Sequence, residues 1–296
     1  MKIAFIGSGQ MGKPMALNML KSEAELMIYV RKADVFSDFE CKSVMVTTNL
    51  LDTIEADIIF LCLPNADAVQ DILLGQKGLI NHLKKGQIVI DFSTIKYDAT
   101  IKIAEALANK EIHFMDAPVS GMESRAIDGT LTIMCGGDME VFNTVKPYFE
   151  CVGNKILYMG NVGSGQLTKL INQLLYNINT AALAEILPIA VKMGLDANKV
   201  GQVVNSGTGR SHASEYFIPN ILKGNFTTSY PMKSAYKDFV SAAELGANLC
   251  IPMPLTAAAT STYQMAILRG YGDCDKGGMI RVYEELLNVL YRSGPE

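Results

Sequence analysis

This chain of 296 residues lacks the residue patterns that several classes of functional site require. There are only three histidines, His82, His113 and His212, and their spacing fits no metal site. The six cysteines are scattered without CxxC or CxxH spacing, which indicates reduced packing residues of a cytoplasmic protein. A net charge of −4 without any basic run argues against nucleic acid as a partner. The first apolar run is too short for a signal peptide, and no uncharged span of about 20 residues predicts a membrane helix.

A dinucleotide-binding pattern opens the chain. Lys2–Ile6 is a short apolar run typical of a buried strand, Gly-Ser-Gly-Gln-Met-Gly follows it, and a helical pattern begins at Met11. In this order a first glycine allows a tight turn, a second lets the backbone approach a pyrophosphate, and a third lets the helix pack on the strand. A chance turn is the alternative. The predicted cofactor-binding residues of this loop are Gly7, Gly9, Gln10, Met11 and Gly12.

Two basic residues bear on the type of cofactor. The second predicted strand, Glu25–Val30, is followed by Arg31 and Lys32, and Asp34 comes a little later. An acidic residue near this point would suit the ribose of NAD, whereas basic residues suit the 2′-phosphate of NADP. The pattern therefore favours NADP over NAD, and a solvated charged turn is the alternative.

Strands and helices alternate through the first half of the chain. Further strands are predicted over residues 43–46, 57–63 and 87–91, with helices over 67–74 and 98–108. Such alternation predicts a parallel, doubly wound sheet whose ligands bind at the carboxyl ends of the strands. We therefore expect Leu63, Pro64, Ser93 and Thr94 to face the cofactor, although Ser93 and Thr94 could instead cap a helix.

A second pattern follows from His113. It contains the loop Asp116–Gly121, a strand over 130–135, a helix over 140–149 and a strand over 155–158. Ser120 and Gly121 could offer a hydroxyl and backbone N–H groups to a carboxylate. A purely structural turn is the alternative.

The longest predicted helix is Ser164–Met193, which contains Pro188 and is apolar almost all round, so we expect it to be buried. Near its start Lys169, Asn172 and Gln173 share one face, where buried polar groups need partners or a ligand. Because a nicotinamide cofactor exchanges only hydride, a general acid/base is also needed, and Lys169 is the best candidate. The alternative is a lysine that extends to solvent.

After this helix the strand patterns stop. The remaining predicted helices cover 197–205, 211–222, 232–247, 254–269 and 279–291. The sequence therefore predicts an α/β Rossmann-type domain over residues 1–161 and an all-α domain over 162–296, joined by the long helix. Lys169 is expected near the crevice between them, where small-molecule sites tend to lie.

Four separated motifs occur in the order typical of one enzyme family. They are Gly7–Gly12 with Met15–Asn18, Asp116–Gly121 with Gly129–Leu131, Gly163–Gln173, and Lys237–Phe239 with Gly272–Asp275. With these motifs the chain resembles, over nearly its whole length, the β-hydroxyacid dehydrogenases, which include 3-hydroxyisobutyrate dehydrogenase, tartronate semialdehyde reductase and the glyoxylate/succinic semialdehyde reductases. The resemblance implies a Rossmann domain, a helical domain, and a homodimer or homotetramer.

The resemblance also implies residue roles. Lys169 would be the general acid/base and Asn172 would orient the substrate, while Ser120 and Gly121 would hold the substrate carboxylate. Arg31 would bind the NADP phosphate, with Val30 and Lys32 replacing the Asn and Thr of the family turn. The remaining residues expected to border the cofactor are Leu63, Pro64, Thr94 and Lys237.

Two departures affect the substrate pocket. The family loop Ser-Gly-Gly reads Ser-Gly-Met here, and Met122 cannot freely use glycine-only backbone angles and could narrow the pocket. Gln173 stands where other members have a second Asn, as in the tartronate semialdehyde type. We therefore add Met122 and Gln173 to the substrate-binding residues.

The expected function is an NADPH-dependent reductase of small aldehyde acids, such as tartronate semialdehyde, glyoxylate or succinic semialdehyde. A 3-hydroxyisobutyrate dehydrogenase that uses NAD is the alternative. Imine reductases generally lack the lysine at position 169, and a non-catalytic dinucleotide-binding module would not need it. The phosphogluconate branch would need more basic residues in the helical half.

Overall fold

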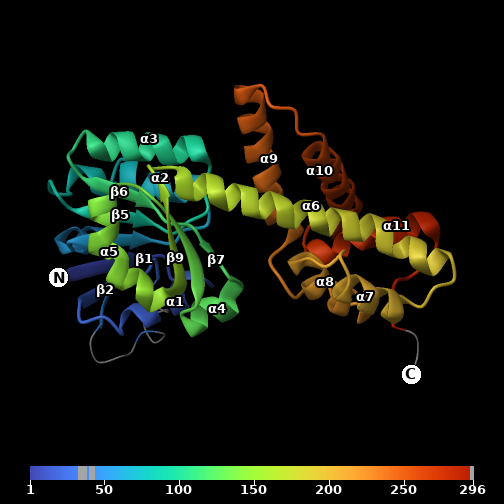
Figure 1. Cartoon of the computed structure of the whole chain (residues 1–296). Coiled ribbons are helices and arrows are strands. Elements are labelled where there is room, and N and C mark those ends of the chain that lie inside the picture. Colours follow the sequence, from blue (N-terminus) through green and yellow to red (C-terminus); the bar gives the residue numbers. More distant parts are fainter. Residues whose placement is uncertain (33–38, 40–43, 294–296) are drawn as a thin grey trace. The chain divides into compact units, whose positions relative to one another are not determined.

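The computed structural model describes residues 1–32, 39 and 44–293 and consists of two compact units (Figure 1). Unit 1 comprises residues 1–169 and unit 2 comprises residues 170–296. Asp34 lies outside the described residues, as does the first residue of the strand predicted over 43–46.

Unit 1 is built on one sheet. The order β3-β2-β1-β4-β5-β6 is parallel throughout and is the strand order of a Rossmann fold. Strand β8 then runs antiparallel to β6 and β7, and β9 pairs in parallel with β8. The predicted Rossmann-type sheet is confirmed. Among the described residues the strands are β1 Lys2–Ile6, β2 Glu25–Tyr29, β3 Val44–Thr47, β4 Ile58–Leu61, β5 Ile88–Asp91, β6 His113–Asp116, β7 Val119–Ser120, β8 Leu131–Gly136 and β9 Gly153–Gly160.

Four neighbouring strands end in register. Ile6 of β1 lies opposite Leu61 of β4, which lies opposite Asp91 of β5, which lies opposite Asp116 of β6. The loops that follow these residues therefore lie along one edge of the sheet, the edge at which doubly wound folds bind ligands.

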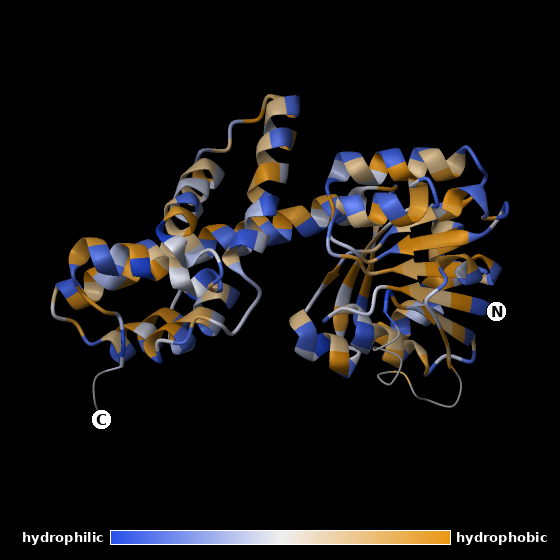
Figure 2. Cartoon of the chain, turned by 180° about the vertical axis from the view of Figure 1, so that it is seen from behind, coloured by the Kyte–Doolittle hydropathy of each residue, from blue (hydrophilic) through white to orange (hydrophobic). Residues whose placement is uncertain are grey.

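Helices cover both faces of this sheet. They are α1 Gly12–Met19, α2 Ala66–Leu74, α3 Tyr97–Ala108, α4 Met122–Asp128 and α5 Met139–Val152. Helices α1 and α5 pack on one face of the sheet, and α2 and α3 pack on the other (Figure 1). The buried residues accordingly form two clusters, one on each face. Phe5 of β1, Phe60 of β4 and Phe92, which directly follows β5, stack with ring centroids 5.6–6.5 Å apart. Burying each such ring stabilises the folded protein by about 1.5–3 kcal/mol. Figure 2 shows that the strands of this sheet are predominantly hydrophobic.

Unit 2 is helical throughout its described residues, as predicted. The helix α6 begins in unit 1 and continues into unit 2, where Phe217, Phe239, Tyr263 and Tyr291 are fully buried. The helices are α6 Ser164–Lys192, α7 Ala197–Ser206, α8 His212–Leu222, α9 Met232–Leu249, α10 Pro254–Ala266 and α11 Ile280–Leu287.

The expectation that the long helix is buried was wrong. Pro188 lies inside α6 without ending it, but Ile171, Leu175, Ile186 and Ile189 are 46–60% exposed. By length and composition alone α6 could cross a membrane, and one third of its most apolar window is buried. A core helix of a soluble protein passes the same test. Composition gives the apolar character of a helix but not which face its neighbours cover.

The ends of the last two helices also differ from prediction. The α-helical part of α10 stops at Ala266, and a wider π-type turn, Ile267–Tyr271, follows, with Gly270 at φ +85°. The last helix ends at Leu287 rather than at residue 291, because Asn288 adopts the left-handed conformation. Tyr291 instead packs inside unit 2 and donates its hydroxyl to the carbonyl of Ala197 at 2.8 Å.

Candidate functional site

The glycine loop after β1 has the geometry that the sequence motif requires. Gly7 has φ +117°, and a Cβ there would lie 2.2 Å from the carbonyl oxygen of Cys62. A Cβ on Gly12 would lie 1.8 Å from the carbonyl oxygen of Gly7, so α1 packs directly on the turn. A Cβ on Gly9 would meet nothing within 4 Å. Close packing therefore requires glycine at positions 7 and 12, and Gly9 leaves the backbone surface open to a phosphate group.

The other two predicted residues of this loop differ in their surroundings. Met11 is half-buried and packs against the core of unit 1. The exposed Gln10 donates from Nε2 to Glu123 Oε2 at 2.6 Å. Because Glu123 follows the predicted carboxylate loop, this bond connects the two loops that the sequence singled out.

The loops after β4 and β5 are joined by a hydrogen bond from the backbone N–H of Leu63 to Ser93 Oγ at 2.8 Å. Ser93 and Thr94 do not cap α3, because Lys96 is its N-cap residue and supplies no side-chain cap. That alternative is therefore wrong. Pro64 is exposed and Thr94 is half-buried.

Arg31 and Lys32 are exposed directly after β2. Exposure leaves both cations available to a phosphate group, and it is equally what a solvated turn would show. Their positions therefore do not separate NADP from NAD.

The predicted carboxylate loop adopts strained backbone angles. Ser120 is half-buried at the end of β7, and Gly121 has φ +148°, where a Cβ would lie 2.8 Å from Cβ of Arg125. Met122 has φ +62° although it is not a glycine, and it is the first residue of α4. A left-handed conformation costs a residue with a side chain about 1–2 kcal/mol. Met122 therefore keeps a glycine-like backbone, as the family loop would.

A carboxylate from β6 binds the start of α6. Asp116 is fully buried and accepts from the backbone N–H of Gly163 at 2.6 Å and of Gln166 at 2.8 Å. These N–H groups have no partner within a helix, and a negative charge there also interacts favourably with the helix dipole. Burial raises the pKa of Asp116 to about 6, against the lowering effect of these bonds.

The side chain of Gln166 ties α6 to the loop after β5. Its Oε1 accepts from the backbone N–H of Ile95 at 3.2 Å, and its Nε2 donates to the carbonyl of Ser93 at 2.7 Å. A Cβ on Gly165 would lie 2.3 Å from the carbonyl of Met134, so only glycine permits this close approach. Sequence reasoning assigned no role to Asp116 or Gln166. The sequence offered only an aspartate at a predicted strand end and a glutamine beside a glycine, and this pattern does not distinguish a helix-binding carboxylate from a solvated one.

A second carboxylate, Asp91, lies next to Asp116 in the sheet. Its Oδ1 accepts from the backbone N–H of Ser93 at 2.9 Å, but its buried Oδ2 has no hydrogen-bond partner among the described residues. Burial, with a smaller contribution from the charge of Asp116, raises the pKa of Asp91 to about 7. Two carboxyl groups with raised pKa values therefore lie beneath the loops of this edge.

The three polar residues predicted on α6 have unequal environments. Lys169 is buried, with 8% of its surface exposed, and lies three residues after the anchored Gln166. Asn172 is exposed and Gln173 is half-buried. Residues three and four apart lie on one helix face, so the three remain neighbours along α6.

Within unit 2 the side chain of Gln173 enters a polar cluster. Its Nε2 lies 3.1 Å from the hydroxyl of Tyr230 and 3.3 Å from Asp238 Oδ2, which also accepts from Asn177 Nδ2 at 3.4 Å. Burial raises the pKa of Asp238, against the opposing charge of Lys237. Lys237 was expected to border the cofactor, and partial desolvation lowers its pKa. Sequence reasoning noted Asp238 only as part of a motif and missed Asn177.

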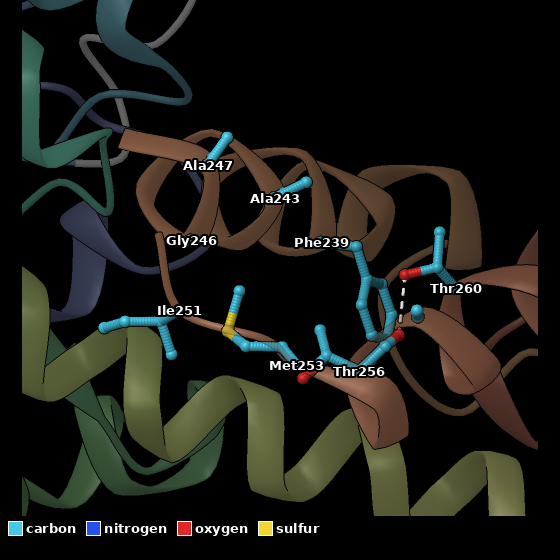
Figure 3. A pocket seen from close by; sticks show the side chains of 9 residues that line it. Phe239, Ala243, Gly246, Ala247, Ile251, Met253, Thr256 and Thr260 are labelled. Carbon is cyan, nitrogen blue, oxygen red and sulfur yellow. Dashed lines mark hydrogen bonds between the residues drawn. The ribbon is translucent and has the colours of Figure 1, made fainter. Parts of the chain in front are cut away.

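Unit 2 also contains a groove lined by other residues (Figure 3). It has a volume of about 210 Å³ and is lined by the carboxyl-terminal half of α9, the first turns of α10 and the segment between them. Its lining includes Phe239, Ile251 and Met253 and no titratable side chain. Such a groove offers no acid/base chemistry.

Two protein families match this chain. Residues 2–160 match the NAD binding domain of 6-phosphogluconate dehydrogenase. Residues 163–283 match the family described as NAD-binding of NADP-dependent 3-hydroxyisobutyrate dehydrogenase. Together the two matches span both units.

Individual relatives extend over almost the full length. The chain is 35% identical over 295 residues to 2-(hydroxymethyl)glutarate dehydrogenase of Eubacterium barkeri, covering 99% of this chain and 98% of that protein. It is 32% identical over 288 residues to 2-hydroxy-3-oxopropionate reductase of Escherichia coli (strain K12), with 97% and 99% covered. A crystal structure of 3-hydroxyisobutyrate dehydrogenase from Salmonella typhimurium matches with a TM-score of 0.83 and 26% identity, over 95% of this chain and 99% of that one.

These matches confirm the resemblance inferred from the four sequence motifs. They also agree with the Rossmann order of the sheet and with the helical second unit. The matched domains bind nicotinamide dinucleotides, and the named relatives act on hydroxyl groups. The chain therefore belongs to the β-hydroxyacid dehydrogenase family and is an NAD(P)-dependent oxidoreductase acting on CH–OH groups.

Proposed function

We propose that this chain is an NADPH-dependent reductase of small aldehyde acids, with Lys169 as its general acid/base. The observation that carries the proposal is the anchoring of α6. Asp116 and Gln166 fix the first turn of that helix to the ends of β5 and β6, and Lys169 follows one turn later. A proton donor must be held in a defined position to act on a bound substrate.

Unit 1 would hold the cofactor at the edge where β1, β4 and β5 end. The open backbone at Gly9 and the start of α1 suit a pyrophosphate. Gln10, Met11, Leu63, Pro64 and Thr94 would border the dinucleotide, with Lys237 supplied by α9. The nicotinamide supplies or accepts the hydride.

The residue types support NADP as the preferred cofactor, because the basic Arg31 and Lys32 follow the second strand near the point where an acidic residue would suit NAD. NAD is the alternative. The comparison of kcat/KM with the two reduced cofactors decides between them.

The protein residues supply the proton and the orientation. Lys169 donates a proton to the carbonyl oxygen of the aldehyde during reduction and removes it from the hydroxyl group in the reverse direction. Asn172 orients that oxygen from the adjoining turn of α6, and Gln173 borders the substrate and contributes to its selection. The hydroxyl of Ser120 and the backbone N–H groups of Gly121 and Met122 hold the substrate carboxylate.

The substrate class follows from the chemistry of the relatives. One named relative acts on 2-(hydroxymethyl)glutarate and another on 2-hydroxy-3-oxopropionate, both small acids. 2-Hydroxy-3-oxopropionate is tartronate semialdehyde, and glyoxylate and succinic semialdehyde are small aldehyde acids of the same class. An NAD-dependent 3-hydroxyisobutyrate dehydrogenase is the second candidate, because the second matched family carries that description.

The substitution Lys169→Ala tests the mechanism. We expect a loss of about 10²- to 10⁴-fold in kcat, the range of general acid/base catalysis, with retained binding of NADPH measured by its fluorescence. Lys192→Ala, near the other end of α6, is the matched control and should keep full activity. Near-normal turnover of the Lys169 variant would remove this residue from the mechanism. Substrates are glyoxylate, succinic semialdehyde, tartronate semialdehyde and 3-hydroxyisobutyrate, each assayed with NADP(H) and NAD(H).

We infer further that the protein is a cytoplasmic homodimer or homotetramer whose dinucleotide-binding domain covers residues 1–161 and whose helical domain covers 162–296. The exposed side chains of Ile171, Leu175, Ile186 and Ile189 support assembly, because they form an apolar stripe along α6. Light scattering of the purified protein gives the oligomeric state, and a monomer at micromolar concentration would contradict this inference.

A further inference from the structure

Unit 2 contains a buried lysine for which the proposed chemistry has no use. Lys276 begins the short 3₁₀ helix η5, Lys276–Met279, and its side chain is fully buried. Its Nζ donates to Asn177 Oδ1 at 2.9 Å and to the hydroxyl of Tyr230 at 3.2 Å, and it lies 3.7 Å from the centre of the Tyr176 ring. Burial of an ammonium group is costly, and the nearby carboxylate of Asp238, whose pKa the charge of Lys276 lowers, offsets part of that cost.

The hydroxyl of Tyr230 is surrounded by donors. Gln173 Nε2 lies 3.1 Å and Lys276 Nζ lies 3.2 Å from its oxygen. A phenolic hydroxyl has two lone pairs and one proton. Both lone pairs are therefore engaged, and within the part of the chain that the structure describes the proton has no acceptor. Tyr230 is 37% exposed, so a ligand can reach the residue.

A second tyrosine, Tyr176, lies near this point, but its hydroxyl is enclosed by the protein. The buried hydroxyl of Tyr176 has no hydrogen-bond partner among the residues described. Burial raises the pKa of Tyr176, with a contribution from nearby Tyr230, and burial also raises the pKa of Tyr230. Both hydroxyls therefore remain protonated near neutral pH, but of the two residues Tyr230 is the one that a ligand can reach.

The carboxylates of this region have donors of their own. Asp238 accepts from Gln173 and Asn177, and Asp275 accepts from the backbone N–H and hydroxyl of Thr228 and from the N–H of Gly277. None of these bonds comes from Tyr230, so among the described residues its proton is available to a bound group. A group that accepts several hydrogen bonds beside an ammonium is typically a carboxylate.

The position of these residues along α6 fits a second end of the substrate. Gln173 and Asn177 follow Lys169 by four and eight residues on one helix face, which places them about 6 and 12 Å along the axis. Assuming the proposed function, we propose that Tyr230 binds a second carboxylate of the substrate and that Lys276 positions Tyr230. The preferred substrates are then dicarboxylic acids that carry a hydroxymethyl or aldehyde group.

Binding of two five-carbon acids tests this subsite directly. Glutarate and valerate differ by one carboxylate, and their affinities for the NADPH-bound protein are measured by calorimetry. We expect the wild type to bind glutarate at least tenfold more tightly than valerate. A hydrogen bond to a charged group corresponds to about 10- to 100-fold in affinity, so Lys276→Met and Tyr230→Phe should each reduce that preference by at least tenfold.

Lys233→Met is the matched control, because Lys233 is an exposed lysine of α9 whose ion pair is with Asp273. It should leave the glutarate preference unchanged. A wild type without this preference, or a Tyr230→Phe variant that keeps it, overturns the proposal even if Lys276→Met does not fold. Lys276→Arg should restore part of the preference, because its positive charge is kept.

The subsite and the proposed function fail separately. A preference for glutarate that depends on Tyr230, in a protein that oxidises no hydroxy acid and reduces no aldehyde acid, supports the subsite and contradicts the function. Turnover of aldehyde acids without any preference for a second carboxylate supports the function and contradicts the subsite.

Discussion

The substitution Asp91→Asn should stabilise this protein, and increasingly so as the pH rises. The carboxyl group of Asp91 is fully buried at the end of β5, and its Oδ2 has no partner among the described residues. An asparagine keeps an oxygen for the N–H of Ser93 and removes the buried charge. Most substitutions at buried polar positions destabilise a protein, so a gain here would be diagnostic.

The magnitude follows from the pKa of this group. The folded state holds the proton up to about pH 7, whereas an unfolded chain releases it near pH 3.9. A raised pKa of an acid means that the folded state binds more protons, so the wild type loses stability as the pH rises through this window. Above pH 8 that loss amounts to about 4 kcal/mol, and at pH 5 to about 1.5 kcal/mol. The advantage of the variant should therefore grow by about 3 kcal/mol between pH 5 and pH 8.5.

Urea unfolding at the two pH values measures this difference. The chain contains no tryptophan, so circular dichroism follows the transition, and amide exchange in β5 identifies the transition of unit 1. Asp98→Asn, at an exposed carboxylate of α3, controls for the removal of a charge. The reasoning is refuted if the free energy difference between the Asp91 variant and the wild type is the same at both pH values.

Two further predictions concern the loops of the site. Gly12→Ala should abolish NADPH binding and lower the melting temperature, because its Cβ would lie 1.8 Å from the carbonyl oxygen of Gly7. Fluorescence titration measures the binding and thermal unfolding measures the melting temperature. Retained NADPH binding would contradict the close packing of α1. Met122→Gly should stabilise unit 1 by up to about 1 kcal/mol, because it relieves a left-handed backbone at φ +62°. Urea unfolding measures the change in stability. A clear loss of stability would show that the Met122 side chain contributes more stability than its backbone conformation costs.

Much of the fold could be predicted from local patterns. Short apolar runs alternating with helical periodicity specified the Rossmann-type sheet, and the absence of strand patterns after residue 161 specified the helical half. Both features arise from neighbours in the chain, because side-chain periodicity directly determines which faces can be buried. Asn288, which ends α11 in a left-handed conformation, was missed because its effect depends on backbone angles rather than on hydrophobicity.

The residues of the candidate site also fall into two groups: those that local sequence predicts and those that only the tertiary structure brings together. The glycine loop and Lys169 could be proposed from the sequence because each belongs to a pattern with fixed spacing within one segment. The partners of α6 could not, because Asp116 meets Gly163 and Gln166 across about fifty residues of intervening chain. Nothing in the local sequence of Asp116 distinguishes a helix-binding carboxylate from a solvated one.

The sequence by itself determined the family, the dinucleotide loop, the alternation of the first half and the identity of the proposed proton carrier. The tertiary structure decided which side of α6 is covered, how its first turn is anchored, and that Lys276 lies with Tyr230 and Asn177. Side-chain spacing along one element is encoded locally, whereas burial and hydrogen bonding between distant elements depend on how the whole chain packs.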